Sequence, residues 1–263
     1  MHPRNSEGLF YFRTFVLVWQ GGENCSGVDC VRIFPVKTPS IVLASNSPRR
    51  RELLKLGCWK FRTRPADVDE SQQPGEAPGA YVLRLAGSKA RACAKSAQVE
   101  EIILAADTAV IHGSAILGKP KEAAEAVEML KDLRGRTHQV YTGLVLLRLS
   151  DGRLVTDLCI TDVPMRSYRD DEIEAYVATG DPLDKAGAYA IQNAGFHPVE
   201  SMQGCYASVM GLPLCHLTRS LQKLDLATGS YIAPGSEIAA ACQSALGYAC
   251  PISSAVLGGE MVG

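Results

Sequence analysis

From residue 41 onward, short apolar runs alternate with helical patterns, and this alternation restricts the possible folds more than any other feature of the sequence. Short apolar runs are typical of buried strands, and amphipathic runs bounded by capping residues are typical of helices. The predicted strands lie at 41–44, 102–106, 139–149, 154–161 and 198–202. The predicted helices lie at 47–57, 79–97, 122–134, 170–180, 212–224 and 236–246. Because helical crossovers favour parallel pairing and hairpins give antiparallel pairing, we expect an α/β fold with a mixed sheet.

Three segments of the chain differ in pattern. Residues 1–39 show no sustained periodicity, and we expect an N-terminal extension that is poorly ordered or accessory. Residues 40–224 carry most of the strand and helix signals and form the predicted domain. Residues 225–263 are a C-terminal extension that offers one capped helix and no readable function. With 263 residues and 46% hydrophobic composition, the chain can bury one large core or two modest ones that share a cleft.

The overall charge argues against several classes of function. The 27 basic residues are balanced by 28 acidic ones, so no general electrostatic attraction to nucleic acid or to an anionic membrane is expected. No apolar run reaches the roughly 18 residues of a membrane span, and the first residues make a poor signal peptide. The nine cysteines form no C-x-x-C pair, which favours reduced core thiols over a zinc site. We therefore expect a cytoplasmic protein in which any anion site is local.

The segment LASNSPRRRELL places three consecutive arginines where a helix begins. Ser47 suits the N-cap and Pro48 suits the first helical position. Cations there are unfavourable by a few tenths to about 1 kcal/mol, because the N-terminal end of the helix dipole is already positive. We therefore expect a bound anion beside Arg49 and Arg50.

Two charged residues interrupt apolar patterns in which an unpaired charge would be costly. Lys89 falls near the middle of the apolar stripe of its helix, which favours an ammonium group that reaches an anion; the alternative is a lysine that extends to solvent from the edge of the stripe. Asp107 follows the apolar run 102–106, which favours a metal ligand or a general base. The alternative is an aspartate at the strand end that caps the next turn.

Two further motifs are weaker. GSAILGKP resembles a Walker A phosphate loop at first, but Pro120 replaces its hydroxyl residue and the preceding residues predict a hairpin, so we reject that interpretation. Lys119 remains an isolated cation beside a rigid proline. The acidic run ADVDE, which ends at Glu70, is typical of a solvated surface, although with Asp107 it could supply the oxygen ligands that Mg²⁺ or Mn²⁺ prefers.

These residues together suit a polyphosphate, because cations and backbone N–H groups hold phosphates while carboxylates hold a metal and a water. The candidate cations are Arg49, Arg50, Lys89, Lys119 and Lys185, and the candidate carboxylates are Glu70 and Asp107. The anion expected at the helix start is therefore a triphosphate.

The order of several motifs resembles that of the Maf-like nucleotide pyrophosphatases. These motifs are LASNSPRRRELL, DVDE, RLAGSKA, AADTAV, ILGKP, GRTHQVYTG, DPLDKAGAYAIQ and GCYASVMGLPL, between Ile41 and Leu224. The resemblance implies hydrolysis of the α–β bond of nucleoside triphosphates, a divalent metal (Mg²⁺ or Mn²⁺) and a role in removing non-canonical nucleotides. It also implies an elongated mixed β-sheet flanked by helices, two lobes around a cleft as in the inosine triphosphatase group, and a homodimer.

The resemblance also implies roles for individual residues. Asp107 would be the general base, Glu70, Lys89 and Lys119 further catalytic residues, and Glu70 and Asp107 the metal ligands. The implied substrate-binding residues are Ser45, Arg49, Arg50, Thr108, Lys185 and Gln192. Arg49, Thr108 and Gln192 resemble the dTTP/UTP branch of the family rather than the 7-methyl-GTP branch, and Thr108 and Gln192 would read the pyrimidine edge.

Four positions depart from the family pattern, and two other functions stay open. Ala190 and Asn193 stand where the family has glycine, and Cys205 and Ser208 replace its serine and asparagine, which affects the expected shape of the base pocket. One alternative is a Maf-like enzyme for purine or methylated nucleotides such as 7-methyl-GTP. The other is a non-catalytic nucleotide-binding regulator of septum formation, which would bind nucleotide without turnover.

Overall fold

The computed structural model describes residues 9–12, 15–18, 32–35, 40–224 and 234–263. Three short strands lie in the N-terminal extension: β1 (Leu9–Phe12), β2 (Phe15–Val18) and β3 (Arg32–Pro35). They form an antiparallel sheet in the order β1-β2-β3, which the sequence patterns did not predict. The expectation of poor order for the rest of residues 1–39 lies outside the described residues.

The main sheet has six strands and mixed pairing. Its strands are β4 (Ile41–Leu43), β5 (Phe61–Thr63), β6 (Ile102–His112), β7 (Ala115–Leu117), β8 (Thr137–Arg148) and β9 (Leu154–Pro164). The order is β5-β4-β6-β8-β9, with β7 paired to the far end of β6. β4 is parallel to both β5 and β6, whereas β6, β8 and β9 form an antiparallel meander. The predicted α/β fold with a mixed sheet is confirmed.

The longer helices lie where capping and periodicity predicted them. They are α1 (Pro48–Lys55), α2 (Pro78–Ala94), α3 (Ala123–Leu133), α4 (Asp170–Ala178), α6 (Leu214–Lys223) and α7 (Gly235–Leu246). The short elements were not predicted, since a single turn leaves no periodic pattern. These are α5 (Tyr206–Val209), α8 (Ser253–Leu257) and the 3₁₀ turns η1 (Asp181–Asp184) and η2 (Ala186–Ala188). Within the described residues, we find no helix with the length and apolar character that a bilayer crossing requires.

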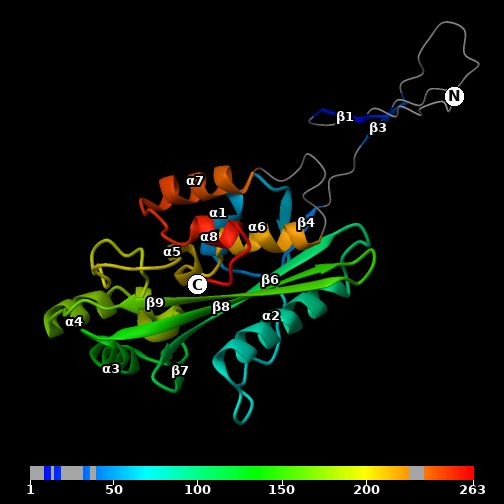
Figure 1. Ribbon diagram of the computed structural model, residues 1–263. Coiled ribbons are helices and arrows are strands. Elements are labelled where there is room, and N and C mark those ends of the chain that lie inside the picture. Colours follow the sequence, from blue (N-terminus) through cyan, green and yellow to red (C-terminus); the bar gives the residue numbers. More distant parts are fainter. Residues whose placement is uncertain (1–8, 13–14, 19–31, 36–39, 225–233) are drawn as a thin grey trace, which may run out of the picture.

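Helices cover both faces of the sheet (Figure 1). α2 lies on one face, against β6 and β8, and α6 lies on the other with α7 and α8 outside it. Gly143 of β8 allows α2 to approach closely, because a Cβ atom there would lie 3.0 Å from backbone atoms of Val82 and Leu83. Gly143 is also the register partner of Asp107 on β6. The close contact therefore brings α2 to the sheet at the level of Asp107.

Two hydrophobic clusters occupy opposite ends of the long strands. One includes Leu53, Leu104 and Leu217 and joins α1 and α6 to the start of β6. The other includes Leu130 and Ile173 and joins α3 and α4 to the ends of β8 and β9. This arrangement matches the predicted two lobes, and the cavity described below is lined by the start of α1 and by the segment 185–192.

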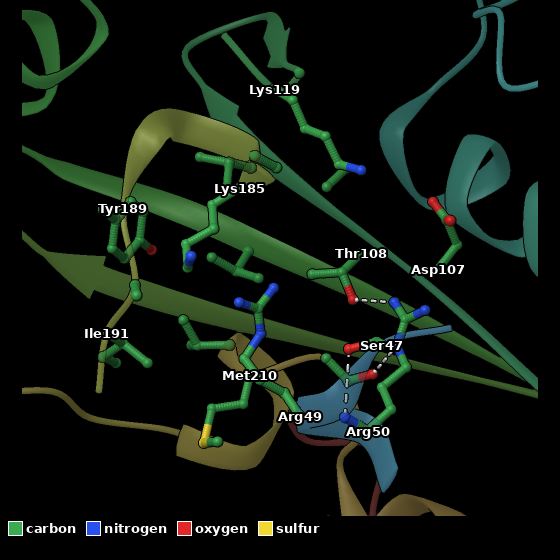
Figure 2. Close-up of a pocket in the computed structure, with 18 of the residues that line it drawn as sticks. Ser47, Arg49, Arg50, Asp107, Thr108, Lys119, Lys185, Tyr189, Ile191 and Met210 are labelled. Carbon is green, nitrogen blue, oxygen red and sulfur yellow. Dashed lines mark hydrogen bonds between the residues drawn. The ribbon is translucent and has the colours of Figure 1, made fainter. Parts of the chain in front are cut away.

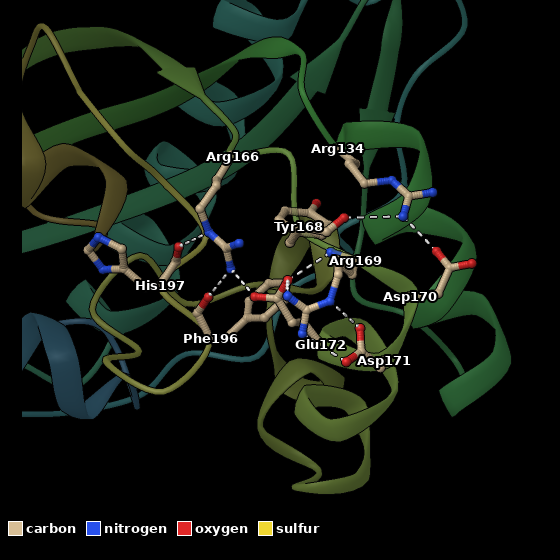
Figure 3. Close-up of polar contacts among 9 residues, drawn as sticks. All are labelled: Arg134, Arg166, Tyr168, Arg169, Asp170, Asp171, Glu172, Phe196 and His197. Atoms are coloured by element: carbon tan, nitrogen blue, oxygen red, sulfur yellow. Dashed lines mark hydrogen bonds and ion pairs between the residues drawn. The ribbon is translucent and has the colours of Figure 1, made fainter.

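The predicted strand at 198–202 is wrong. Only an isolated bridge between Met165 and Val199 forms there. Just before this segment, the Arg166 guanidinium donates to the carbonyl oxygens of Phe196 (2.8 Å) and His197 (3.1 Å), so the chain enters the segment from a loop (Figure 3). His197 also has a φ of 46°, which breaks an extended conformation.

The N-cap of α4 is a basic residue and not an acidic one. Arg169 occupies the cap position, and Asp170 and Asp171 lie in the first turn. The backbone N–H of Arg169 donates to the Glu172 carboxylate at 2.9 Å (Figure 3). The acidic residues therefore act on the helix dipole from within the first turn instead of capping it.

Candidate active site

A polar cavity lies between the two lobes. Its walls come from the start of α1, from α2, from β6 and β7, and from the segments 185–192 and 209–211. All the predicted site residues except Ser45 line it: Arg49, Arg50, Glu70, Lys89, Asp107, Thr108, Lys119, Lys185 and Gln192. Segments more than 140 residues apart in sequence therefore meet at one site.

Lys89 joins two carboxylates at the floor of the cavity. Its ammonium nitrogen lies 2.6 Å from Oδ1 of Asp107 and 2.7 Å from Oε1 of Glu70. The Lys89 and Asp107 side chains are only 12% and 11% exposed, whereas Glu70 is 58% exposed. The alternative in which Lys89 extends to solvent is therefore wrong.

Asp107 does not lie at the end of its strand, as the sequence suggested. β6 continues to His112, so Asp107 sits in the middle of a buried central strand. The alternative of a turn-capping aspartate is therefore wrong as well. A carboxylate at such a place requires a cationic partner, and Lys89 supplies it.

The two carboxyl groups have opposite pKa shifts. Burial raises the pKa of Asp107 above its usual value, although the charges of Lys89 and Arg50 oppose this effect. Burial also raises the pKa of Glu70, but the hydrogen bond from Lys89 and the charges of Lys89, Lys119 and Arg50 outweigh it, so the pKa ends below its usual value. Two carboxyl groups whose pKa values are moved apart are a pattern found at catalytic sites.

Arg50 is held by the protein, while Arg49 points into the cavity. Ser47 caps α1, and its hydroxyl accepts from the Arg50 N–H at 3.4 Å. The Arg50 guanidinium donates to the Gly211 carbonyl at 2.8 Å and to the Thr108 hydroxyl at 3.1 Å. Burial lowers the pKa of Arg50 from its usual value, and the charge of Asp107 acts in the opposite direction.

Ser45 does not line the cavity but contacts residues that do. Its hydroxyl accepts from the backbone N–H of Ser47 at 3.1 Å and from Arg50 at 3.4 Å. Ser45 is buried, so the predicted substrate-binding residue instead fixes the start of α1.

Lys119 and Lys185 extend the cationic lining on the opposite side. Figure 2 shows Arg49, Lys119 and Lys185 reaching the cavity from three separate segments. Lys185 is already paired: its ammonium lies 2.8 Å from the Asp181 carboxylate and 2.6 Å from the Asp184 carboxylate. Lys119 is exposed beside Pro120 and is the more accessible of the two to a ligand.

An apolar wall, which the sequence patterns did not reveal, completes the cavity. It includes Val140, Tyr189, Ile191 and Met210 (Figure 2). The Tyr189 hydroxyl lies 2.8 Å from Nε2 of the buried His138. Burial lowers the pKa of His138 to about 4, so its imidazole is neutral at pH 7. A cavity with both apolar and cationic lining residues suits a ligand with an aromatic base and phosphates.

The donor set suits a metal that also binds substrate. The described residues contain no group of three or more His, Cys, Asp or Glu that could hold an ion alone. Glu70 and Asp107 nevertheless converge on one nitrogen atom inside the cavity. Mg²⁺ is commonly held by one or two carboxylates together with substrate phosphates and water, so the residues present fit such an ion.

The sequence comparison gives the family. The model of the Maf-like protein family matches residues 40–224, more than half of the chain. The chain belongs to the Maf-like family. The predicted resemblance is confirmed, and the motifs that carried it supply most of the polar lining of the cavity.

Several curated relatives carry one name. The dTTP/UTP pyrophosphatase of Geobacter sp. (strain M21) is 47% identical over 187 residues, which cover 71% of this chain and 96% of that protein. The dTTP/UTP pyrophosphatase of Bacillus cytotoxicus is 46% identical over 184 residues, which cover 70% of this chain and 95% of that protein. Among solved structures, the Staphylococcus aureus Ham1 protein aligns with a TM-score of 0.37 and 16% identity, over 72% of this chain and 96% of that one.

Of the four departures from the Maf-like pattern, only Ala190 lines the cavity. Asn193 stabilises the loop next to the cavity, because its side chain donates to Asp181 and accepts from the Phe196 N–H. Cys205 is the residue before α5. Ser208 lies in α5 and its carbonyl accepts from Thr142. The last three departures therefore change the support of the cavity and not its surface.

Proposed function

We propose that this Maf-like protein is a nucleoside triphosphate pyrophosphatase that hydrolyses dTTP and UTP to the monophosphate and pyrophosphate. The observation that carries the proposal is the Asp107–Lys89–Glu70 cluster, with Asp107 buried, in a cavity also lined by Arg49 and Lys119. The names of relatives at 46–47% identity, dTTP/UTP pyrophosphatases, support the same reaction and the same substrates. We also propose that modified pyrimidine nucleotides are cleaved.

Asp107 is the group best placed to activate water. Its raised pKa makes it a stronger base than an ordinary aspartate, and its Oδ1 accepts from the Lys89 ammonium at 2.6 Å. In the proposed step, the water oxygen attacks the α-phosphorus, its proton passes to Asp107, and the bond to the bridging oxygen breaks. Pyrophosphate leaves with the electron pair of that bond.

The cations act on the growing charge of the leaving group. Lys89 fixes the direction of the Asp107 carboxylate, and Lys119 and Arg49 neutralise the phosphate oxygens. Glu70 and Asp107 would hold the divalent metal, which when bound would polarise the phosphoryl oxygens. Arg50 holds the wall of the site through Gly211 and Thr108.

The predicted roles in base recognition need revision. The Thr108 hydroxyl already contacts Arg50 at 3.1 Å and Thr142 at 3.0 Å, so it has little capacity left for a base. Gln192 is exposed at the rim of the cavity, and its amide can donate to and accept from a pyrimidine edge. We therefore assign base recognition to Gln192 and a supporting role to Thr108.

The homodimer and the cytoplasmic location are part of this proposal and rest on the family resemblance and on sequence composition. Gel filtration with light scattering would test the dimer. The measured mass should be twice that of one 28.2 kDa chain.

A substrate panel tests the reaction itself. Pyrophosphate release is measured from dTTP, UTP, CTP, GTP and 7-methyl-GTP, with Mg²⁺, with Mn²⁺ and with a chelator. We expect turnover of dTTP and UTP that requires a metal. Preferred turnover of GTP or 7-methyl-GTP would contradict the substrate assignment, and binding without turnover of any nucleotide would favour the regulator.

A further inference from the structure

The C-terminal segment 234–263, which lies beyond the family match, packs against the support of the active site. α7 and α8 lie on α6 (Figure 1), and Nη1 of Arg219 in α6 donates to the Glu260 carbonyl at 2.5 Å. The Tyr248 hydroxyl lies 2.9 Å from the Met202 carbonyl and 3.0 Å from the Gly204 carbonyl. The hydrogen bonds of Tyr248 therefore connect the segment to the loop that leads into α5.

Three cysteines meet at this contact. Cys159 comes from β9, Cys205 precedes α5, and Cys250 belongs to the C-terminal segment. The Cys250 sulfur lies 3.7 Å from the carbonyl oxygen of Gly204, the residue that directly precedes Cys205. Cys205 and Cys250 also line the same small pocket, which favours a reaction between these two thiols.

We propose that Cys205 and Cys250 are an oxidation site, at which a peroxide links the C-terminal segment covalently to the start of α5. The Cys250 thiolate attacks one peroxide oxygen, the O–O bond breaks, and a sulfenic acid and hydroxide form. The Cys205 sulfur then attacks the Cys250 sulfur and displaces the hydroxyl group, which leaves as water with the Cys205 proton. Two thiols are oxidised to one disulfide, and one peroxide is reduced to two waters.

The surroundings assign the two roles. Cys250 is half-buried, and the hydrogen bond from Cys205 lowers the pKa of its thiol to about 7, so much of it is thiolate at neutral pH. Cys205 is buried, and its hydrogen bonds with Cys159 and Cys250, together with burial, raise the pKa of its thiol. The accessible thiolate reacts with peroxide first, and the buried thiol then resolves the sulfenic acid.

The linked residues lie one short helix away from the cavity. α5 leads directly to Met210 and Gly211, which line the cavity, and the Gly211 carbonyl holds Arg50. Thr142, which contacts Thr108, also donates to the Ser208 carbonyl of α5. A disulfide at the start of α5 therefore affects the Gly211 carbonyl that holds Arg50. Its consequence for catalysis rests on the proposed function.

Peptide mapping of the full chain tests the linkage without any assay of activity. The protein is treated with hydrogen peroxide, alkylated without reductant and digested. Trypsin leaves Cys205 with Cys215 in 186–219 and Cys242 with Cys250 in 224–263, and chymotryptic cleavage after Tyr206 and Tyr248 separates each pair. We expect a linked species that joins the Cys205 and Cys250 peptides, is two hydrogens lighter than their sum, and disappears on reduction.

Two variants make the outcome specific. Cys250→Ser removes a half-buried thiol and should abolish the linked species, whereas Cys58→Ser removes an exposed thiol elsewhere and should leave it unchanged. Oxidation of Cys250 to a sulfinic acid without a link, or a link from Cys250 to another cysteine, would overturn the proposal. Failure of nucleotide turnover would leave this mapping unaffected, so the two proposals fail separately.

Discussion

At the scale of single residues, Lys89 determines how the two carboxylates of the cavity behave. Its charge lowers the pKa of both Asp107 and Glu70, but burial dominates at Asp107 alone. One ammonium group therefore favours the charged form of both the buried Asp107 and the exposed Glu70. This arrangement predicts a specific response to neutralising Lys89.

Replacing Lys89 by glutamine should shift the pH dependence of catalysis. Lys89→Gln keeps a donor near Asp107 but removes the charge that lowers its pKa, so the acid limb of the kcat/KM profile should move to higher pH. We also expect kcat/KM to fall roughly 10²-fold, because a charge that stabilises the transition state is lost. Lys95→Gln, at the exposed end of the same helix, should leave the profile unchanged. An acid limb that stays in place or moves down would contradict the assignment.

His138 should make the fold sensitive to acid. Burial lowers its pKa to about 4 from 6.5, so between these values the unfolded chain binds more protons and stability rises with pH. The contribution of the neutral His138 to the free energy of unfolding is fully present above pH 6.5. It falls by about 3 kcal/mol as the pH decreases towards 4. Denaturant unfolding at pH 7 and pH 4 should show this loss in the wild type and not in His138→Gln. Equal pH dependence of the two proteins would refute the prediction, and His197→Gln, at an exposed histidine, should behave as the wild type.

At the scale of elements, the site depends on how closely α2 approaches β8. Asp107 and Gly143 are paired across β6 and β8, and α2 lies over this pair. Without a side chain at Gly143, the backbone of α2 can come near enough for Lys89 to reach Asp107. A glycine that does not line the cavity thus positions a proposed catalytic residue.

Gly143→Ala should separate the helix from the sheet. The added Cβ would lie 3.0 Å from backbone atoms of α2, so the protein should lose about 1–3 kcal/mol of unfolding free energy. The activity should fall by more than this loss of stability explains, because Lys89 moves away from Asp107. Gly195→Ala is the control, since a Cβ there meets only the Asn193 side chain at 3.5 Å. Activity equal to that of the control would show that α2 tolerates the change.

The sequence predicted the elements that are long and periodic, and the site residues that stand out as charges within apolar patterns. Lys89 and Asp107 are such residues, and the structure joins them. Tyr189 and Met210 could not be found in this way, because apolar residues that line a cavity have the same pattern as core residues. The pairing of Lys185 with Asp181 and Asp184 depends on a 3₁₀ turn that has no period to detect.

At the scale of the whole molecule, the C-terminal segment completes the environment of α6. Residues from Leu214 to Leu221 are buried without interruption, so α6 is covered on all sides, by the sheet on one side and by α7 and α8 on the other. A surface helix would leave its polar side exposed. The described part of the segment therefore belongs to the structural core of the domain.

Ending the chain after Leu224 should consequently destabilise the domain. The outer side of α6, including Cys215, would become exposed, and Arg219 would lose its contact with the Glu260 carbonyl. We expect the thermal midpoint to fall by about 5 °C or more. Glu260→Ala in the full chain keeps that carbonyl and should change the midpoint little. A truncated chain that unfolds at the wild-type temperature would show that the segment contributes nothing to the fold.

The most direct test of the whole account is pyrophosphate release from dTTP with Mg²⁺, measured for the wild type and Asp107→Asn side by side. The substitution keeps the shape of the side chain and removes the base, so we predict a loss of roughly 10²- to 10⁴-fold in kcat with an unchanged fold. Asp67→Asn, at an exposed position of the ADVDE run, is the control and should retain activity. Turnover by Asp107→Asn within a few-fold of the wild type would contradict the claim that the Asp107–Lys89–Glu70 cluster carries the reaction.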